Sequence, residues 1–132
     1  TTLKDLIKSI NAPNIKFVNI QYGNTTEEIL KLKNEINFDI VTFNDIDNFN
    51  DIDSLASVMA ACDNIVTIDN STAQLAGSLG LDTKLLLSSA PDVRWGHQGA
   101  SCFWYNSIKI YRQIILGDWS EPLKQLEKDL NN

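Results

Sequence analysis

A short stretch at residues 66–80, VTIDNSTAQLAGSLG, brings together residue types suited to binding an anion and a sugar. A run of β-branched residues ends at Asp69, and Asn70, Ser71 and Thr72 precede a helix rich in small residues. Ligands of open parallel sheets lie at the carboxyl ends of strands, where the next helix offers free backbone N–H groups and its positive dipole end. The pattern favours a diphosphate at Ser71 and Thr72, with Asp69 accepting sugar hydroxyls. The alternative is structural, with Asp69 or Asn70 as the helix N-cap.

A second group of candidates lies in the loop SSAPDVRWGHQGASCFWY, which follows the next strand and reaches the same sheet edge. Arg94 can bind a phosphate through two parallel hydrogen bonds, and Trp95 can stack on a base or a sugar. Equally, Arg94 can pair with Asp92, and the Trp95 ring can close the edge of the domain. The single histidine, His97, is expected to be a solvated loop residue rather than a catalytic base.

Other reactive or aromatic residues have structural explanations. Trp104 and Tyr105 precede the last strand and are expected in the core. Arg112, at the end of that strand, is an ordinary edge charge unless a ligand cleft reaches it. Cys62 and Cys102 are not spaced as a metal clip or a redox pair, and we expect Cys62 to pack in the core.

Composition and missing motifs exclude several function classes. The net charge of −6 and the absence of a basic stripe argue against a nucleic-acid partner. The stretch DIDNFNDID at 45–53 lacks the Gly and Glu that a calcium loop needs. The sequence contains no G-x-G-x-x-G, no Walker lysine motif, no G-x-S-x-G and no His/Cys metal cluster. A dinucleotide oxidoreductase or an ordinary hydrolase is therefore poorly supported, and we expect neither a metal nor a cofactor.

Targeting signals are also missing from the sequence. No apolar run approaches the ~20 residues of a bilayer span, so we expect no transmembrane segment. The first residues, TTLKDLIKSINAPN, are amphipathic and unlike a signal peptide, and two Cys in this length suggest reduced thiols. We expect a cytoplasmic chain that forms one domain over residues 1–132 and is a fragment of a longer protein.

Hydrophobic spacing predicts the elements that hold these residues. Thr25 with Glu28 forms a predicted capping box, and Asp53 a predicted N-cap. Helices are expected at 3–10, 25–36, 53–62, 71–79 and from Ser120 onward, and strands at 15–21, 38–43, 65–68, 84–87 and 108–112. Short apolar strands alternating with helices predict βαβ units. The fold class is therefore α/β, a Rossmann-like three-layer α/β/α sandwich with a mostly parallel sheet.

The pattern L-A-x-x-x-A-A-C-D…D-N-S-T-A-x-L-A-G-x-L-G, followed by APDVRWG, FWY, YRQ and GDW, resembles a known family. It is similar to the C-terminal half of glycosyltransferases with the two-domain GT-B architecture, nearest to the ADP-heptose:lipopolysaccharide heptosyltransferases of glycosyltransferase family 9. The resemblance is closest to bacterial proteins that carry this domain behind tetratricopeptide repeats. It implies that the domain binds a nucleotide-diphosphate sugar, with Asp69 at the sugar hydroxyls and Asn70, Ser71 and Thr72 at the sugar–phosphate.

Two positions depart from the family pattern. Gln74 stands where heptosyltransferases usually have His, so an amide replaces a ring donor. After the first strand the sequence reads NIQYGN, with Tyr22 and no basic residue near the phosphates. Gln21, Tyr22 and Asn24 remain candidates for lining the cleft.

The resemblance implies a metal-independent sugar transfer that is competent only with an N-terminal acceptor domain. We therefore expect the chain alone to bind a donor through Asp69, Asn70, Ser71, Thr72, Gln74, Arg94, Trp95 and Tyr22, without turnover. Expected partners are the nucleotide-diphosphate sugar and an acceptor domain or tetratricopeptide repeats of the same chain. The alternative is a degenerate interaction or scaffold domain, which Gln74 and Tyr22 favour. A weaker option is a GT-B-like nucleotide-sugar epimerase.

Overall fold

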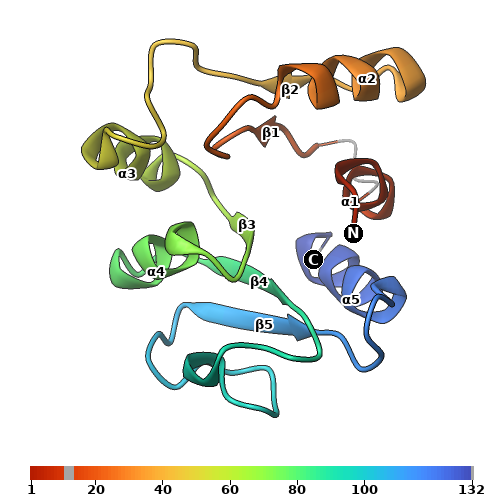
Figure 1. The fold of residues 1–132 in the computed structure, drawn as a ribbon, viewed down its shortest axis with the longest axis vertical. Coiled ribbons are helices and arrows are strands. Elements are labelled where there is room, and N and C mark those ends of the chain that lie inside the picture. Colours follow the sequence, from red (N-terminus) through yellow and green to blue (C-terminus); the bar gives the residue numbers. More distant parts are fainter. Residues whose placement is uncertain (11–13, 132) are drawn as a thin grey trace.

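The computed structural model describes residues 1–10 and 14–131 as parallel strands alternating with helices (Figure 1). This confirms the predicted α/β class, and the arrangement is compatible with a Rossmann-like α/β/α fold. The helices are α1 (Leu3–Ser9), α2 (Thr26–Ile36), α3 (Ile52–Ala60), α4 (Ser71–Ser78) and α5 (Ser120–Leu130), with a short helical turn, η1 (Val93–Trp95). The strands are β1 (Phe17–Val18), β2 (Ile40–Val41), β3 (Ile65–Ile68), β4 (Thr83–Leu87) and β5 (Ile108–Arg112).

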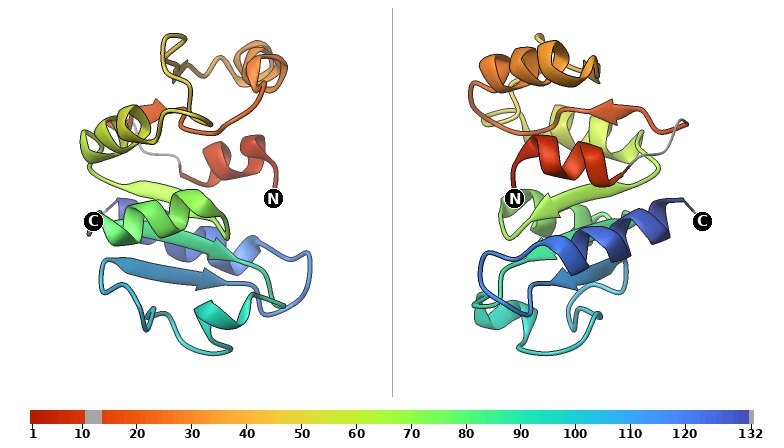
Figure 2. Two further views of the ribbon diagram at one scale, coloured as in Figure 1. Left: turned by 60° about the vertical axis from the view of Figure 1, so that its left-hand side comes forward. Right: turned by 90° about the vertical axis from the view of Figure 1, so that its right-hand side faces the viewer.

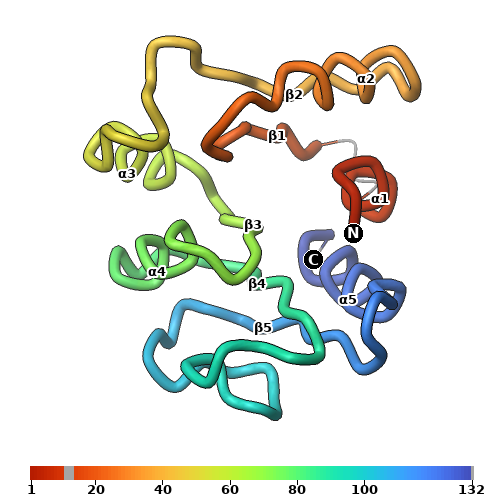
Figure 3. The backbone as a smooth tube through the Cα atoms, viewed as in Figure 1, coloured from red at the N-terminus to blue at the C-terminus, as the bar shows by residue number. Residues whose placement is uncertain are grey.

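The strands form two separate parallel groups within the described residues. β3, β4 and β5 make a three-stranded sheet in that order, with Ile65 opposite Thr83 and Thr83 opposite Ile108. β1 and β2 pair beside it, with Phe17 opposite Ile40. The tube in Figure 3 follows the chain from this pair through α3 into β3. Because β3, β4 and β5 pair in parallel, their carboxyl ends meet at one edge.

Alternation along β4 divides the core between the two faces of the sheet. Leu85 and Leu87 pack with Ala73 of α4 and with Trp95, whereas Leu86 packs with Tyr111 and the inner face of α5. Every residue of β4 is buried. This is the pattern of a central strand in a parallel sheet covered on both faces.

The helices form the outer layers. Figure 2 shows α3 and α4 in front of the sheet in its left view, and α1 and α5 in front of it in its right view. A further core cluster joins Leu55 and Met59 of α3 to Ile65 and to Ala76 of α4. Cys62 packs against this cluster, as predicted. Small residues on α4 let this helix lie close to its neighbours, which fixes the backbone just after β3.

Some local predictions were wrong in their details. The strands expected at 15–21 and 38–43 are reduced to two residues each. Much of these stretches is only half-buried or exposed, so little burial drives a longer ladder. The N-cap of α3 is Asp51, whose side chain accepts from Ser54 N–H, rather than Asp53.

The predicted capping box of Thr25 and Glu28 is also wrong. The Thr25 side chain caps nothing, because its hydroxyl oxygen accepts from the Asn19 side-chain amide at 2.9 Å. A reciprocal capping box is present instead at the start of α1, between Thr2 and Asp5.

Candidate functional site

The centre of the candidate site is the contact between Asp69, directly after β3, and Trp95, the last residue of η1. The Trp95 Nε1–H donates to Asp69 Oδ1 at 2.6 Å, which confirms that the loop after β4 reaches the edge where β3 ends. Trp95 is only 2% exposed and packs against Ala73, Leu85 and Leu87. Its ring therefore closes the edge of the domain, as the structural alternative predicted, and has no free face on which a base could stack in this conformation.

Asn70, rather than Asp69, is the N-cap of α4. Its Oδ1 accepts from Ala73 N–H at 3.1 Å and from the Thr67 hydroxyl at 3.2 Å. Asp69 remains an exposed residue, so its carboxylate has lone pairs free beyond the indole bond. Within the described residues, the backbone N–H groups of Ser71 and Thr72 have no protein acceptor. The site thus offers a carboxylate next to unpaired N–H donors at the positive end of a helix.

Arg94 forms an ion pair with Asp92. Arg94 Nε donates to Asp92 Oδ1 at 2.9 Å and one terminal nitrogen donates to Asp92 Oδ2 at 3.3 Å. The hydrogen bonds and charge of Asp92 raise the pKa of Arg94, and the charge of Asp69 adds a smaller contribution. The Arg94 guanidinium is therefore close enough to interact with the charge of Asp69, but its N–H groups donate to Asp92. An exposed pair of this kind contributes little to stability, so an incoming phosphate can compete for the guanidinium.

Gln74 lies on α4, one turn beyond the N-cap, and contacts the loop before β5. Its Oε1 accepts from the Tyr105 hydroxyl at 2.8 Å, while its Nε2 is buried with no partner among the described residues. The Tyr105 ring lies directly over Gly77, where an added Cβ would stand 2.5 Å from Tyr105 Cγ. Tyr105 is therefore partly buried, close to the core position expected for it.

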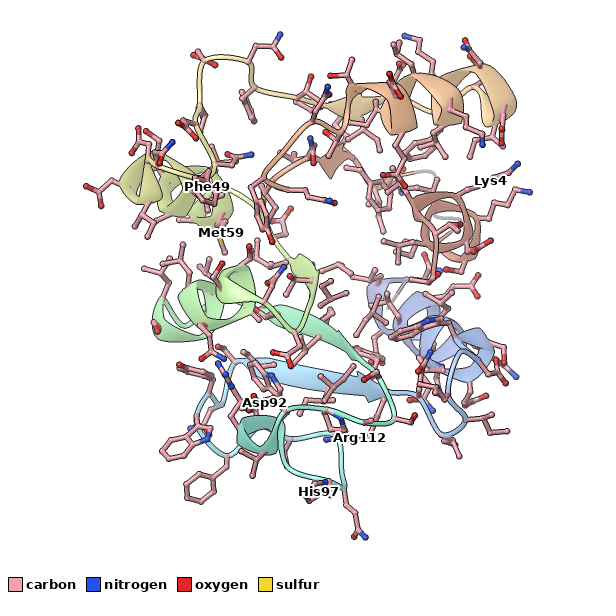
Figure 4. The ribbon with its side chains drawn as sticks, in the orientation of Figure 1. Lys4, Phe49, Met59, Asp92, His97 and Arg112 are labelled. Carbon is pink, nitrogen blue, oxygen red and sulfur yellow. The ribbon has the colours of Figure 1, made fainter. Side chains whose placement is uncertain are left out.

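Arg112, interpreted from the sequence as an ordinary edge charge unless a ligand cleft reaches it, contacts the loop of the candidate site. Its two terminal nitrogens donate to the carbonyl oxygens of Trp95 and Gly96, both at 3.1 Å. Burial lowers the pKa of Arg112, since desolvation disfavours its charge. Figure 4 shows Arg112 above the loop that carries His97. The sequence feature that pointed to a site role is the position of Arg112 as the last residue of a parallel strand, which puts it at the same sheet edge as Asp69.

Two aromatic residues and the histidine complete the loop. Trp104 is 65% exposed, so its predicted core position is wrong. Its ring meets the exposed Phe103 edge to face, with centroids 5.2 Å apart, and neither joins the buried cluster. His97 is an exposed loop residue, as expected, and lies far down the loop in Figure 4.

Tyr22 belongs to a different part of the surface. It lines a hollow of about 470 Å³ at the carboxyl ends of β1 and β2, together with Gln21 and Phe49. Of the other residues predicted to bind the donor, none lines this hollow in the part of the chain that the structure describes. Tyr22 thus lines a hollow that neither Asp69 nor Trp95 lines.

Two further properties of the described chain bear on the site. Across residues 1–10 and 14–131, no group of three or more His, Cys, Asp or Glu side chains is arranged to hold a metal ion. In the same residues, none of the helices has the length and apolar character needed to cross a membrane.

Comparison with known proteins gives one distant similarity. Protein FlbA of Caulobacter vibrioides is 29% identical over 124 residues, which cover 93% of this chain and 20% of FlbA. The chain thus spans about a fifth of the length of the relative it matches. No family model matches the chain, and no solved structure does.

Proposed function

We propose that this chain is the donor-binding domain of a metal-independent GT-B glycosyltransferase, similar to the heptosyltransferases of glycosyltransferase family 9. The observation that carries the proposal is the Asp69 carboxylate, exposed at the carboxyl end of β3 and fixed by Trp95. A carboxylate held beside free helix N–H groups suits a ligand with sugar hydroxyls on one side and phosphates on the other.

In this proposal Asp69 accepts hydrogen bonds from the donor-sugar hydroxyls. The N–H groups of Ser71 and Thr72 bind the diphosphate, while Asn70 keeps the first turn of α4 in place. Arg94 leaves Asp92 to pair with a phosphate oxygen, which costs little because that pair is exposed. These groups would stabilise the negative charge that grows on the departing diphosphate.

Two of the remaining predicted residues take supporting roles. Trp95 orients Asp69 from inside the core rather than stacking on the ligand. The Gln74 amide accepts from the Tyr105 hydroxyl, and its Nε2, which has no partner among the described residues, is the donor that this side chain offers to the ligand. Tyr22 lines the hollow at the ends of β1 and β2 and takes no part in this proposed donor site. No resident cofactor takes part, and the nucleotide-diphosphate sugar is the substrate.

Transfer requires a second domain. The bond between the anomeric carbon and the phosphate oxygen breaks, a bond to an acceptor oxygen forms, and the acceptor proton passes to a base outside this chain. The partners are therefore an acceptor-binding domain, or tetratricopeptide repeats, of the same longer protein, located in the cytoplasm. The chain alone is expected to bind donor without turning it over.

A second candidate function is a degenerate interaction or scaffold domain. Two observations favour it: Arg94 is already paired with Asp92, and the Trp95 ring fills the edge of the domain. In this case the α/β fold persists while the donor site stays closed.

A titration of the chain with ADP-, UDP- and GDP-sugars, followed by amide NMR shifts, separates the two functions. We expect shifts centred on residues 69–74 and 92–96 at ~mM affinity, where the binding free energy is about −4 kcal/mol. Asp69→Ala should abolish them, whereas Asp63→Ala, at an exposed Asp before β3, should not. Absence of shifts with every sugar nucleotide would favour the scaffold function.

A further inference from the structure

The hollow at the carboxyl ends of β1 and β2 has a lining unlike that of the site around Asp69. Its volume of about 470 Å³ lies within the range of small-molecule sites. The rings of Tyr22, Phe43 and Phe49 lie along it, all three exposed, and Phe49 is 72% exposed. Figure 4 shows Phe49 on the loop that leads into α3. Large aromatic rings held open at the wall of a hollow provide apolar faces for a ligand.

The walls are held in place by side-chain amides. Asn48 Nδ2 donates to the backbone oxygen of Gln21 at 3.3 Å and so joins the loop before α3 to the loop after β1. Asn19 donates to the Thr25 hydroxyl and accepts from Gln21 N–H, which fixes the turn between β1 and α2. The hollow is therefore ordered before a ligand arrives, which lowers the entropic cost of binding.

The charge of the lining excludes phosphates and other anions. Among the described residues, no Lys or Arg lines the hollow, and Asp47 is the one Asp or Glu that does. Asp47 accepts from the backbone N–H groups of Phe49 and Asn50 and from the Asn50 amide. These hydrogen bonds lower the pKa of Asp47, so its carboxylate stays ionised and adds a negative charge at the hollow. A ligand without negative charge therefore fits this lining best.

Polar groups without protein partners define what that ligand must carry. Among the described residues, the side chains of Gln21, Asn44 and Thr42 line the hollow and make no hydrogen bond within the chain. Amides and hydroxyls both donate and accept, which matches the hydroxyl groups of a sugar. The Tyr22 and Phe49 rings are tilted by 54° with centroids 6.0 Å apart, so they do not form a parallel slot for a flat base. A puckered sugar ring can place its C–H groups on both inclined faces.

We propose that this hollow is a binding site for a neutral sugar ring without phosphate. The site is distinct from the nucleotide-sugar site around Asp69 and does not depend on it. Tyr22 and Phe49 supply the apolar contact, and Gln21, Thr42 and Asn44 bind the hydroxyl groups.

A ligand panel followed by amide NMR shifts tests this proposal. The probes are neutral methyl glycosides of glucose, galactose, mannose and N-acetylglucosamine, with glucose 1-phosphate, glucuronate, choline and uridine as the other arms. We expect at least one neutral glycoside to shift residues 19–26 and 42–49 at ~mM affinity. Phe49→Leu keeps apolar bulk without the ring, and should weaken binding about tenfold. Phe103→Leu, at an exposed ring outside the hollow, should leave it unchanged.

Three results would overturn the proposal. These are no shifts at the hollow with any neutral glycoside, stronger binding there of uridine, choline or an anionic sugar, and equal affinities for the Phe49→Leu chain and the unmodified chain. The Asp69→Ala variant should bind the neutral glycoside normally, so failure of the nucleotide site and failure of this site are separate outcomes.

Discussion

The indole N–H of Trp95 donates to the carboxylate of Asp69 at 2.6 Å, across 26 positions of the sequence. This bond ties the first residue after β3 to the helical turn that follows β4. It fixes the direction of the one exposed carboxylate at the start of α4, while the Trp95 ring itself stays in the core. The geometry of the candidate site therefore depends on a residue that a ligand need not touch.

Trp95→Phe should show how much this bond stabilises the fold. Phe keeps an aromatic ring in the core but removes the N–H donor and some volume, so the free energy of unfolding should fall by about 2 kcal/mol. Urea unfolding measures the change. Trp104→Phe is the matched control, because Trp104 is exposed, and it should change stability by less than about 0.5 kcal/mol. Equal losses in the two variants would mean that the Asp69 bond contributes nothing.

Gly77→Ala should destabilise the chain although Ala favours helices more than Gly does. The new Cβ would stand 2.5 Å from the Tyr105 ring, so either the ring or α4 must move. We expect a loss of about 1–3 kcal/mol in thermal or urea unfolding. Ser78→Ala, at the next and exposed position of α4, should be close to neutral.

Removing the ring tests the cause of that loss. The double variant Gly77→Ala/Tyr105→Ala should show a smaller penalty for the Gly77 change than the single variant shows. An unchanged penalty would mean that the clash with Tyr105 is not its source.

Arg112→Lys should loosen the loop that carries Asp92, Arg94 and Trp95. A lysine keeps the charge but cannot donate in a planar fork to the carbonyl oxygens of Trp95 and Gly96. Amide hydrogen exchange in residues 92–97 should become faster, and the free energy of unfolding should fall by about 1–2 kcal/mol. Arg94→Lys, in an exposed ion pair, serves as the control and should leave exchange nearly unchanged. Slow exchange in the Arg112→Lys chain would contradict this role.

Hydrophobic periodicity predicted the strands of the three-stranded sheet well. β3 and β5 lie at the predicted residues, and β4 begins one residue early, because their apolar runs are buried and bounded by turn residues. β1 and β2 are shorter than predicted because their residues are only half-buried or exposed. A local sequence pattern does not reveal how much of a strand is buried. Asp51 and Asp53 are both suitable N-caps, so the choice between them depends on where α3 begins. The sequence locates a helix start only to within a few residues.

The candidate site was predictable only in part. The position of Asp69 follows from the general rule that ligands lie at the carboxyl ends of parallel strands. That Trp95 points inward and Trp104 outward depends on the path of a long loop, which no periodicity encodes. The role of Arg112 depends on two backbone carbonyl oxygens of that same loop, so it became visible only in three dimensions.

The decrease in the free energy of unfolding at acid pH should depend on Asp129. Hydrogen bonds from Lys109 and, secondarily, Tyr111 lower the pKa of Asp129 below its ordinary value. A carboxyl whose pKa is depressed on folding stabilises the chain above its unfolded pKa, and this contribution is lost as the pH falls through the folded pKa. Stability should therefore decline as the pH drops below about 4.

Asp129→Asn tests this assignment. Urea unfolding measured between neutral and acid pH should show a smaller decrease in the free energy of unfolding in the variant. The free energies of the two proteins should therefore become more similar as the pH falls. Asp63→Asn, at an exposed carboxyl, should keep the shape of the unmodified curve. Parallel curves for the Asp129→Asn chain and the unmodified chain would contradict the assignment.

In the proposed function, Asp69 recognises the sugar of a nucleotide-diphosphate sugar. The most direct measurement is the affinity of the chain for a sugar nucleotide and for the matching nucleoside diphosphate, each with and without Asp69→Asn. Asn keeps an oxygen for the Trp95 indole but loses the charge, so the site should remain folded. We expect about tenfold weaker binding of the sugar nucleotide in the variant. Binding of the nucleoside diphosphate, through Ser71 and Thr72, should be unaffected. Equal affinities of the variant and the unmodified chain for the sugar nucleotide, or no binding of any sugar nucleotide, would contradict the claim.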